Sequence, residues 1–166
     1  DMKELKNTDR YDAAVIITDK ELFMPQMHVY LRPTTLAVGI GCRRDTTGSE
    51  VLAAIDDACR RVGRSRKSIA IVASSVVKQE EIGLLAAVQK MEVPIRFFSN
   101  EELQHMIQLY DLTESEFVKN EIGVGNVCEA AVLSGPEPVQ LIARKTRCSK
   151  ITVAIARGHF MSWGSD

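Results

Sequence analysis

Two adjacent arginines lie just beyond a glycine-containing hydrophobic stretch in the first third of the chain. The stretch LAVGIG (36–41) is followed after one residue by Arg43 and Arg44. Arginine side chains bind carboxylates and phosphates through paired hydrogen bonds. Gly39 and Gly41 let a ligand approach the backbone closely, and exposed backbone amides can bind anions. The pattern therefore predicts an anion-binding site here, with a tight turn carrying two solvated arginines as the alternative.

A nucleotide is a poorer candidate for the ligand of this stretch. Gly39 and Gly41 follow a predicted strand and precede a predicted helix, as in the dinucleotide-binding fingerprint, but that fingerprint needs a third glycine where this chain has Arg44. The next strand ends in serines rather than in the acidic residue that binds a ribose. The phosphate-binding pattern GxxxxGK is also absent.

Two serines and a lysine follow the next hydrophobic stretch, SIAIVAS (68–74). Ser74 and Ser75 carry hydroxyls that can orient a water molecule or a carbonyl group, and Lys78 can bind a carboxylate. In the alternative interpretation Ser75 caps a helix and Lys78 is a solvated side chain. Open α/β sheets bind ligands at the carboxyl ends of their strands, which is where these residues are expected to lie.

Glu129 is the strongest candidate for acid–base chemistry. It lies in the first turn of a predicted helix, where the helix dipole favours an ionised carboxylate and hence a base. Asn126, three positions earlier, offers a structural alternative in which the two residues form a capping box. Lys145, which ends the segment LIARK, either faces the same ligand or ends a strand, and the sequence leaves both open.

The cysteines and histidines indicate neither a nucleophile nor a metal site. Cys42 and Cys128 have no histidine near them in sequence, and a free cysteine is most often a small buried hydrophobic residue. The four cysteines form no CxxC pair and the three histidines form no cluster. We therefore expect no metal bound by protein side chains.

Composition is that of a globular domain. The chain has 166 residues, 45% of them hydrophobic and 26% charged, with a net charge of −1. This charge creates no overall field that would recruit nucleic acid or an anionic membrane, and the basic segment 59–67 has no interleaved aromatic residues. No apolar run approaches the roughly 20 residues that span a bilayer. We expect no nucleic-acid or membrane partner and a cytoplasmic location.

Strands alternate with helices along the chain, which predicts an α/β fold: a three-layer domain with a mixed, mainly parallel β-sheet flanked by helices. Hydrophobic runs predict strands over 11–18, 27–33, 35–40, 68–74 and 93–98, and a closing hairpin over 139–145 and 151–157. Helical spacing predicts helices from residue 50 to Gly63 and over 80–91, 100–110 and 126–135. Thr47 with Glu50, and Ser99 with Glu102, have the spacing of capping residues at the starts of two of these helices.

Several motifs, in this order, resemble the C-terminal domain of the cobalamin-biosynthesis protein G family, from about Pro33 to Arg157. They are GIGCRR (39–44), the AxS segment with a following lysine (73–78), FxSxEEL (97–103), GVGNVCEAAVL (123–133), and LIARK before TVAIAR. The family contains the cobalt-precorrin-5A hydrolase of anaerobic vitamin B12 synthesis and a related single-domain protein of the aerobic pathway. The family usually has glycine where this chain has Asp45.

The resemblance implies a hydrolase that opens the δ-lactone of a corrinoid intermediate and releases acetaldehyde. Cobalt arrives inside the substrate, so no cofactor of the protein itself is implied. The acetate and propionate arms of such a substrate suit paired arginines. On this basis we predict catalytic residues at Glu129, Ser74 and Lys78, and substrate-binding residues at Gly39, Gly41, Arg43, Arg44, Ser75, Asn126 and Lys145.

The resemblance also implies a domain arrangement and partners. We expect residues 1–32 to be a linker and the remnant of an upstream or central region, 33–157 to be the family domain, and 158–166 to be a tail. Upstream domains of the same protein are expected partners, and self-association is left open. The alternative function is a non-catalytic module that binds or carries the tetrapyrrole.

Overall fold

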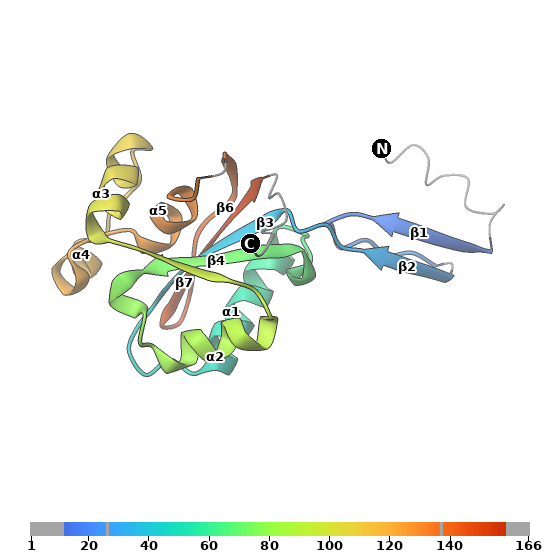
Figure 1. The fold of residues 1–166 in the computed structure, drawn as a ribbon, viewed down its shortest axis with the longest axis horizontal. Helices are drawn as coiled ribbons and strands as arrows, with labels where there is room; N and C mark the ends of the chain where they lie inside the picture. The colour runs from blue at the N-terminus through green and yellow to red at the C-terminus, as the bar shows by residue number, and fades with distance from the viewer. Residues whose placement is uncertain (1–11, 26, 137, 159–166) are drawn as a thin grey trace, which may run out of the picture.

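The body of the molecule is a five-stranded sheet in the order β5–β4–β3–β7–β6 (Figure 1). This computed structural model describes residues 12–25, 27–136 and 138–158. The strands are β3 (Leu36–Cys42), β4 (Ile69–Ser75), β5 (Ile95–Phe98), β6 (Val139–Cys148) and β7 (Ile151–Gly158). β3, β4 and β5 pair in parallel, whereas β7 is antiparallel to both β3 and β6. The predicted mixed sheet is confirmed.

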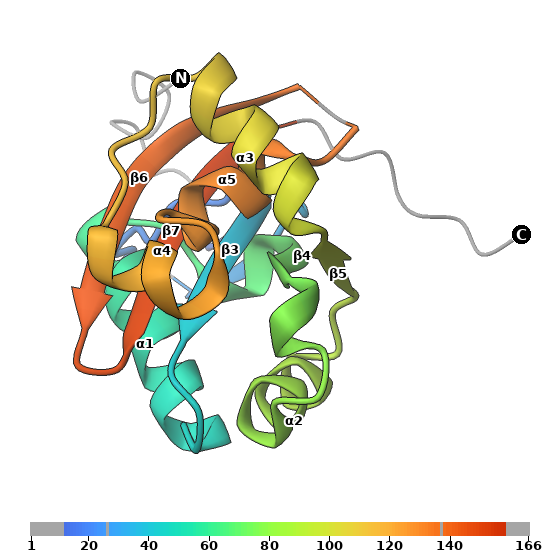
Figure 2. The ribbon, with the colours of Figure 1, turned by 90° about the vertical axis from the view of Figure 1, so that its left-hand side faces the viewer.

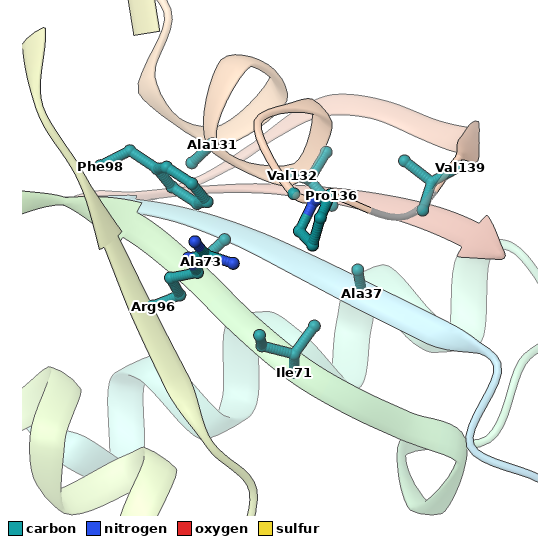
Figure 3. Close-up of a pocket in the computed structure, with 10 residues that line it drawn as sticks. Ala37, Ile71, Ala73, Arg96, Phe98, Ala131, Val132, Pro136 and Val139 are labelled. Atoms are coloured by element: carbon teal, nitrogen blue, oxygen red, sulfur yellow. The ribbon is translucent and has the colours of Figure 1, made fainter. Parts of the chain in front are cut away.

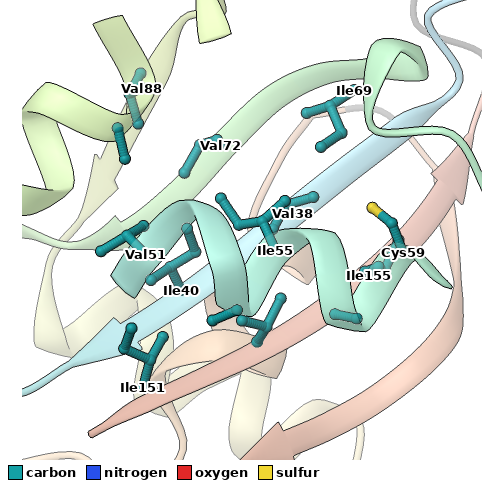
Figure 4. Packing of buried hydrophobic residues seen from close by; sticks show 14 of the residues in the cluster. Val38, Ile40, Val51, Ile55, Cys59, Ile69, Val72, Val88, Ile151 and Ile155 are labelled. Atoms are coloured by element: carbon teal, nitrogen blue, oxygen red, sulfur yellow. The ribbon is translucent and has the colours of Figure 1, made fainter. Parts of the chain in front are cut away.

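Helices cover both faces of the sheet, which gives the three layers expected from the sequence. The helices are α1 (Gly48–Arg61), α2 (Ile82–Met91), α3 (Asn100–Leu109), α4 (Glu116–Ile122) and α5 (Val127–Leu133), with short 3-10 turns η2 (Arg66–Ser68) and η3 (Val76–Lys78). α1 and α2 pack on one face around a core of branched aliphatic side chains (Figure 4). α3 and α5 pack on the other face.

The two faces of the sheet differ in side-chain size, and this difference sets how closely the helices approach. In β3, Leu36, Val38 and Ile40 face α1 and α2, while Ala37 shares the opposite face with α3 and α5. β7 repeats the pattern, with Val153 and Ile155 on the first face and alanines on the second. Small residues let a helix pack close to the sheet, and every residue of α5 is buried.

The predicted helix starts at Thr47 and Ser99 are confirmed in detail. Thr47 and Glu50 form a capping box at α1, and Ser99 and Glu102 form one at α3. Such boxes satisfy two backbone N–H groups that the first helical turn leaves unpaired. The chain leaves α1 through Gly63, whose φ of 62° lies in the left-handed region that glycine tolerates best.

Helix α4 was not expected from the sequence. The helix has only seven residues, and its one apolar pair at helical spacing, Val118 and Ile122, is too short a pattern to predict a helix. Gly123 ends the helix with a φ of 87°. The closing hairpin is confirmed, but β6 runs on to Cys148, so the turn to β7 is shorter than expected.

A separate two-stranded sheet projects from the body (Figure 1). It consists of β1 (Ala13–Ile17) and β2 (Met27–Leu31), which pair in parallel and in register. We call residues 13–31 the arm. Neither strand pairs with the five-stranded sheet.

A buried carboxylate attaches the arm to the body. Asp19 is 3% exposed and accepts hydrogen bonds from Thr35 Oγ1 (2.8 Å), Arg157 Nε (2.7 Å) and Arg64 Nη1. Its backbone carbonyl accepts from Ser65 N (2.8 Å). The arm therefore leaves the body from a fixed base rather than from a free linker.

Across the part of the chain that the structure describes, no helix combines the length and the hydropathy that crossing a membrane would require.

Candidate functional site

The carboxyl ends of β3, β4 and β5 meet at one edge of the sheet (Figure 2). We call this the carboxyl edge, made of the residues that follow these three strands: 43–47, 76–78 and 99–100. α4 lies beside this edge: the guanidinium carbon of Arg43 is 5.4 Å from the centroid of the Phe117 ring in α4. Open α/β sheets bind ligands at this edge, so the structure brings the first two predicted groups of residues to the expected place.

Arg43 and Arg44 project from a loop whose backbone is held by the protein. Arg43 N donates to Lys150 O (3.0 Å), and Thr46 Oγ1 donates to Arg43 O (2.7 Å). Both arginine side chains are exposed, and neither forms an ion pair within the described residues. They present two exposed guanidinium groups on a fixed loop, and that of Arg43 also lies over the Phe117 ring.

Asp45, in the same loop, has a left-handed backbone conformation with a φ of 59°. This conformation favours glycine, and aspartate is among the residues that adopt it at moderate cost. This conformation agrees with the glycine that the resemblance leads us to expect at this position.

Gly39 and Gly41 are buried inside β3, and the protein itself makes the close approach that glycine permits. A Cβ atom on Gly39 would lie 1.8 Å from the Cys128 carbonyl oxygen in α5. A Cβ atom on Gly41 would lie 2.7 Å from Thr152 Oγ1 and 3.5 Å from Val127 Cβ. Gly39 therefore lets α5 pack directly on β3, whereas Gly41 leaves room for the Thr152 side chain of β7, and the contact of either glycine with a ligand stays a prediction.

The residues after β4 form a hydrogen-bonded link across the carboxyl edge. Ser74 Oγ donates to Ile40 O (2.8 Å), which joins the ends of β3 and β4. Ser75 Oγ accepts from Val77 N (3.3 Å), as expected for a cap, and lies 3.5 Å from Asn100 Oδ1. Asn100 Nδ2 in turn donates to Ile122 O (2.7 Å) at the end of α4. Asn100 was missed from the sequence, although it lies just beyond the end of β5, as the two serines lie at the end of β4.

Lys78 is neither free nor solvated. Its side chain is 8% exposed, and Nζ donates to Glu81 Oε1 at 3.0 Å. The ammonium group is close enough to Cys42 to affect that thiol electrostatically, but burial dominates and raises the pKa of Cys42 to about 11. Lys78 is thus a buried side chain within the carboxyl edge, paired with the carboxylate of Glu81, which no sequence motif indicates.

Asn126, Glu129 and Lys145 form a second group, at the start of α5. Asn126 Oδ1 accepts from Glu129 N (3.3 Å), and Asn126 Nδ2 donates to Thr113 O (3.1 Å) and to Glu129 Oε2. Glu129 Oε1 accepts from Lys145 N (2.9 Å). Asn126 caps the helix as predicted, but the Glu129 carboxylate binds β6 rather than closing a capping box.

Glu129→Gln should lower the free energy of unfolding by about 1–3 kcal/mol, because a buried donor would lose its acceptor. Glu129 is 4% exposed and both carboxylate oxygens accept hydrogen bonds. One amide oxygen of glutamine can serve Lys145 N, but its NH₂ group then faces Asn126 Nδ2. Urea unfolding would measure the loss, with Glu101→Gln on the exposed first turn of α3 as the control. Equal stability of both variants would contradict this account.

The cysteines are not activated nucleophiles. Burial raises the pKa of Cys128 to about 11 and that of Cys59 to about 12, so both thiols are protonated at neutral pH. No group of three His, Cys, Asp or Glu side chains suited to a metal ion occurs among residues 12–25, 27–136 and 138–158.

An apolar hollow lies elsewhere, on the sheet face next to α5 (Figure 3). Ala37, Ile71 and Ala73 are among its lining residues, with Arg96 and Phe98 from β5. None of the predicted site residues lines it, so it is not part of the candidate site.

The structure defines an open α/β domain with a basic edge at the carboxyl ends of its parallel strands. Residues 36–156 match the family model described as cobalamin synthesis G C-terminus. The chain belongs to this family, which serves cobalamin biosynthesis, and the expected family is confirmed.

Three comparisons show how the chain relates to known proteins. It is 28% identical to a probable cobalt-precorrin-5A hydrolase from Methanocaldococcus jannaschii, over 92% of this chain and 49% of that protein. The crystal structure of CobE, a protein from the cobalamin biosynthetic pathway, superposes with a TM-score of 0.69 and 28% identity, over 77% of this chain and 94% of CobE. A cobalamin biosynthesis protein G homolog from Sulfolobus solfataricus shares the fold, with a TM-score of 0.58 and 22% identity, over 95% of this chain and 54% of that protein.

The chain thus spans about half the length of the Methanocaldococcus protein, and less than half of other curated cobalt-precorrin-5A hydrolases that it matches.

Proposed function

We propose that this chain is the corrinoid-binding domain of a cobalt-precorrin-5A hydrolase and that the carboxyl edge holds the substrate. The observation that carries the proposal is the pair Arg43 and Arg44, exposed and without an ion-pair partner in the described residues, at the edge where open α/β sheets bind ligands. Guanidinium groups are suited to the carboxylate arms of such a substrate.

Apolar side chains beside the arginines support a macrocyclic ligand over a small anion. Phe117 in α4 is 58% exposed, and Val76 and Val77 in η3 are 37% and 48% exposed. A corrinoid combines an apolar ring with carboxylates at its periphery. An edge that places apolar side chains next to two arginines matches both parts.

The catalytic part of the proposal concerns Ser74, Lys78 and Glu129, with Ser75, Asn126 and Lys145 as further contacts. Opening the lactone requires activation of water and stabilisation of an oxyanion. In the free protein, Ser74, Lys78 and Glu129 are already bonded to protein groups. This observation favours the second candidate function, a domain that binds the tetrapyrrole while the chemistry needs further residues.

Replacing both Arg43 and Arg44 with alanine should weaken binding of cobalt-precorrin-5A about 100-fold or more, because each charge-assisted hydrogen bond is worth about 1.5–3 kcal/mol and about 1.4 kcal/mol corresponds to a factor of ten. Anaerobic absorbance titration of the purified chain would measure the dissociation constant. The matched control replaces Arg60 and Arg61, which are exposed at the end of α1 and paired with Asp57. Equal affinities of the two double variants would rule out the carboxyl edge as the binding site.

A turnover assay separates the two candidate functions. Cobalt-precorrin-5A is incubated anaerobically with the chain, and acetaldehyde is assayed. Acetaldehyde release would assign the hydrolysis to this chain, and Glu129→Gln would then be compared at equal folded fractions. Binding without release would favour the binding or carrier module.

A cytoplasmic location, as expected from the sequence, is part of the proposal.

A further inference from the structure

The two arginines of the carboxyl edge differ in one contact. The guanidinium carbon of Arg43 lies 5.4 Å from the centroid of the Phe117 ring, which is a cation–π distance. Its neighbour Arg44 lies over no aromatic ring in the part of the chain that the structure describes. A cation–π contact uses the charge of a guanidinium group but none of its N–H donors, so the donors of Arg43 remain for a carboxylate. The two side chains are therefore not equivalent as ligand-binding groups.

The Phe117 ring restrains a side chain that is otherwise free to move. The Arg43 backbone is fixed, because its N–H donates to Lys150 O and its carbonyl accepts from Thr46 Oγ1. The Arg43 side chain is exposed and forms no ion pair with any residue that the structure describes. An exposed arginine samples many rotamers, and ordering them when a ligand binds reduces the affinity. A ring that holds the guanidinium group before the ligand arrives removes part of this loss.

The helix that carries Phe117 is itself held in place, although it buries no residue. The two ends of its loop are joined by a hydrogen bond from Ser115 N to Gly125 O (2.9 Å). At the end of α4, Asn100 Nδ2 donates to Ile122 O (2.7 Å) and ties the helix to the residues that follow β5. Backbone and side-chain hydrogen bonds, rather than apolar burial, thus fix the position of the Phe117 ring.

The pair of Arg43 and Phe117 lies where a ligand can reach it. The Phe117 side chain stays 58% exposed with the guanidinium group over it. Arg43 follows β3 directly, at the edge where open α/β sheets bind ligands. The contact therefore sits inside the candidate site rather than on a remote surface.

We propose that Phe117 is a positioning residue of the carboxyl edge. Its ring holds the Arg43 guanidinium group in the orientation that binds one carboxylate arm of the substrate. Arg43 is then the arginine that fixes how the substrate is placed, whereas Arg44 adds a mobile positive charge. This inference rests on the proposed function, because it concerns the same edge and the same substrate.

Phe117→Leu should weaken binding of cobalt-precorrin-5A about five- to 30-fold, as expected for the loss of a cation–π contact that a bound ligand shields from water. Leucine keeps an apolar side chain on α4 but has no aromatic face. Phe117→Tyr keeps the aromatic face and should bind as the native chain does. Anaerobic absorbance titration would give the dissociation constants. The control is Phe23→Leu, on a residue that is 92% exposed between β1 and β2, and it should not change the affinity.

A double-mutant cycle separates positioning of Arg43 from direct contact between the ring and the macrocycle. In a chain that already carries Arg43→Ala, Phe117→Leu should cause no further loss of affinity, because the ring would have no guanidinium group to hold. In a chain that carries Arg44→Ala, the full loss should remain. A loss as large with Arg43→Ala as in the native background would show that Phe117 acts on the ligand directly, and it would overturn the inference.

Failure of this inference and failure of the proposed function give different results. If the Arg43 and Arg44 double variant loses affinity while Phe117→Leu binds like the native chain, only the positioning role of Phe117 is overturned. If the native chain does not bind cobalt-precorrin-5A, or if the arginine double variant binds it equally well, the proposed function fails and this inference fails with it.

Discussion

Gly39→Ala should lower the free energy of unfolding by about 3 kcal/mol or more, which is the upper end of the cost of overpacking a core. The added methyl group would lie 1.8 Å from the Cys128 carbonyl oxygen and 2.8 Å from its carbonyl carbon. Both are backbone atoms in a helix whose residues are all buried, so no flexible side chain can move aside. Either α5 or β3 has to shift, and the alanine-rich contact between them is lost.

Gly135→Ala is the matched control, because a Cβ atom there has no neighbour within 4 Å. Urea unfolding of both variants would measure the difference. A Gly39→Ala variant as stable as Gly135→Ala would show that the approach of α5 to β3 is not tight, and the proposal that Gly39 serves packing would fail. A folded but weakened Gly39→Ala variant should also show faster amide exchange in α5.

The fold could be predicted from the sequence wherever local pattern and tertiary contact agree. Thr47 and Ser99 form capping boxes that depend only on residues three positions apart, and both are present. The β-branched run of β4 likewise identifies a strand with both faces covered. α4 was missed for a physical reason: it spans only seven residues and none of them is fully buried, so its apolar residues form too short a pattern to identify a helix.

The sequence could predict where the candidate site residues lie in the fold, but not the hydrogen-bond and ion-pair partners of their side chains. The positions of Arg43 just after β3 and of Ser74 and Ser75 at the end of β4 follow from the parallel order of these strands. The partners of Lys78 and Glu129 depend on side-chain direction and on β6, which is distant in sequence. Local spacing predicted a Glu129 capping contact, but in the structure its carboxylate joins α5 to the Lys145 backbone.

The attachment of the arm could not be predicted, because its parts are far apart in the chain. Asp19 lies in a polar connection with no motif, and Arg64 and Arg157 are 45 and 138 positions away. A single aspartate with distant partners gives no periodic signal. Its burial is visible only once β7 and the turn after α1 are placed beside it.

Asp19→Asn should lower the free energy of unfolding at pH 7 by about 3 kcal/mol, because it removes the charge that compensates a poorly exposed arginine. The Asp19 side chain is 4% exposed and that of Arg64 is 17% exposed. Burial alone would raise the pKa of Asp19, but the hydrogen bonds from Arg157 and Thr35 and the charge of Arg64 outweigh it. The pKa of Asp19 therefore lies below its ordinary value of 3.8.

A lowered pKa fixes the sign of the pH dependence. The unfolded chain takes up this proton at a higher pH than the folded chain, so the contribution of Asp19 is fully present above the ordinary value of 3.8 and is lost as pH falls through its lower folded pKa. The difference in stability between the native protein and Asp19→Asn should therefore be constant from pH 7 to about pH 5 and should shrink toward pH 3. Urea unfolding over this range would measure it.

Asp56→Asn provides the control, since Asp56 also pairs with an arginine through both oxygens, but with both side chains 43% exposed. An exposed pair is worth at most about 1 kcal/mol, so this variant should lose little. Equal losses for the two variants would show that the Asp19 cluster is worth no more than a surface ion pair. The arm would then be held mainly by other contacts at its base, such as the backbone hydrogen bonds from Ser65 N to Asp19 O and from Glu21 N to Gly63 O.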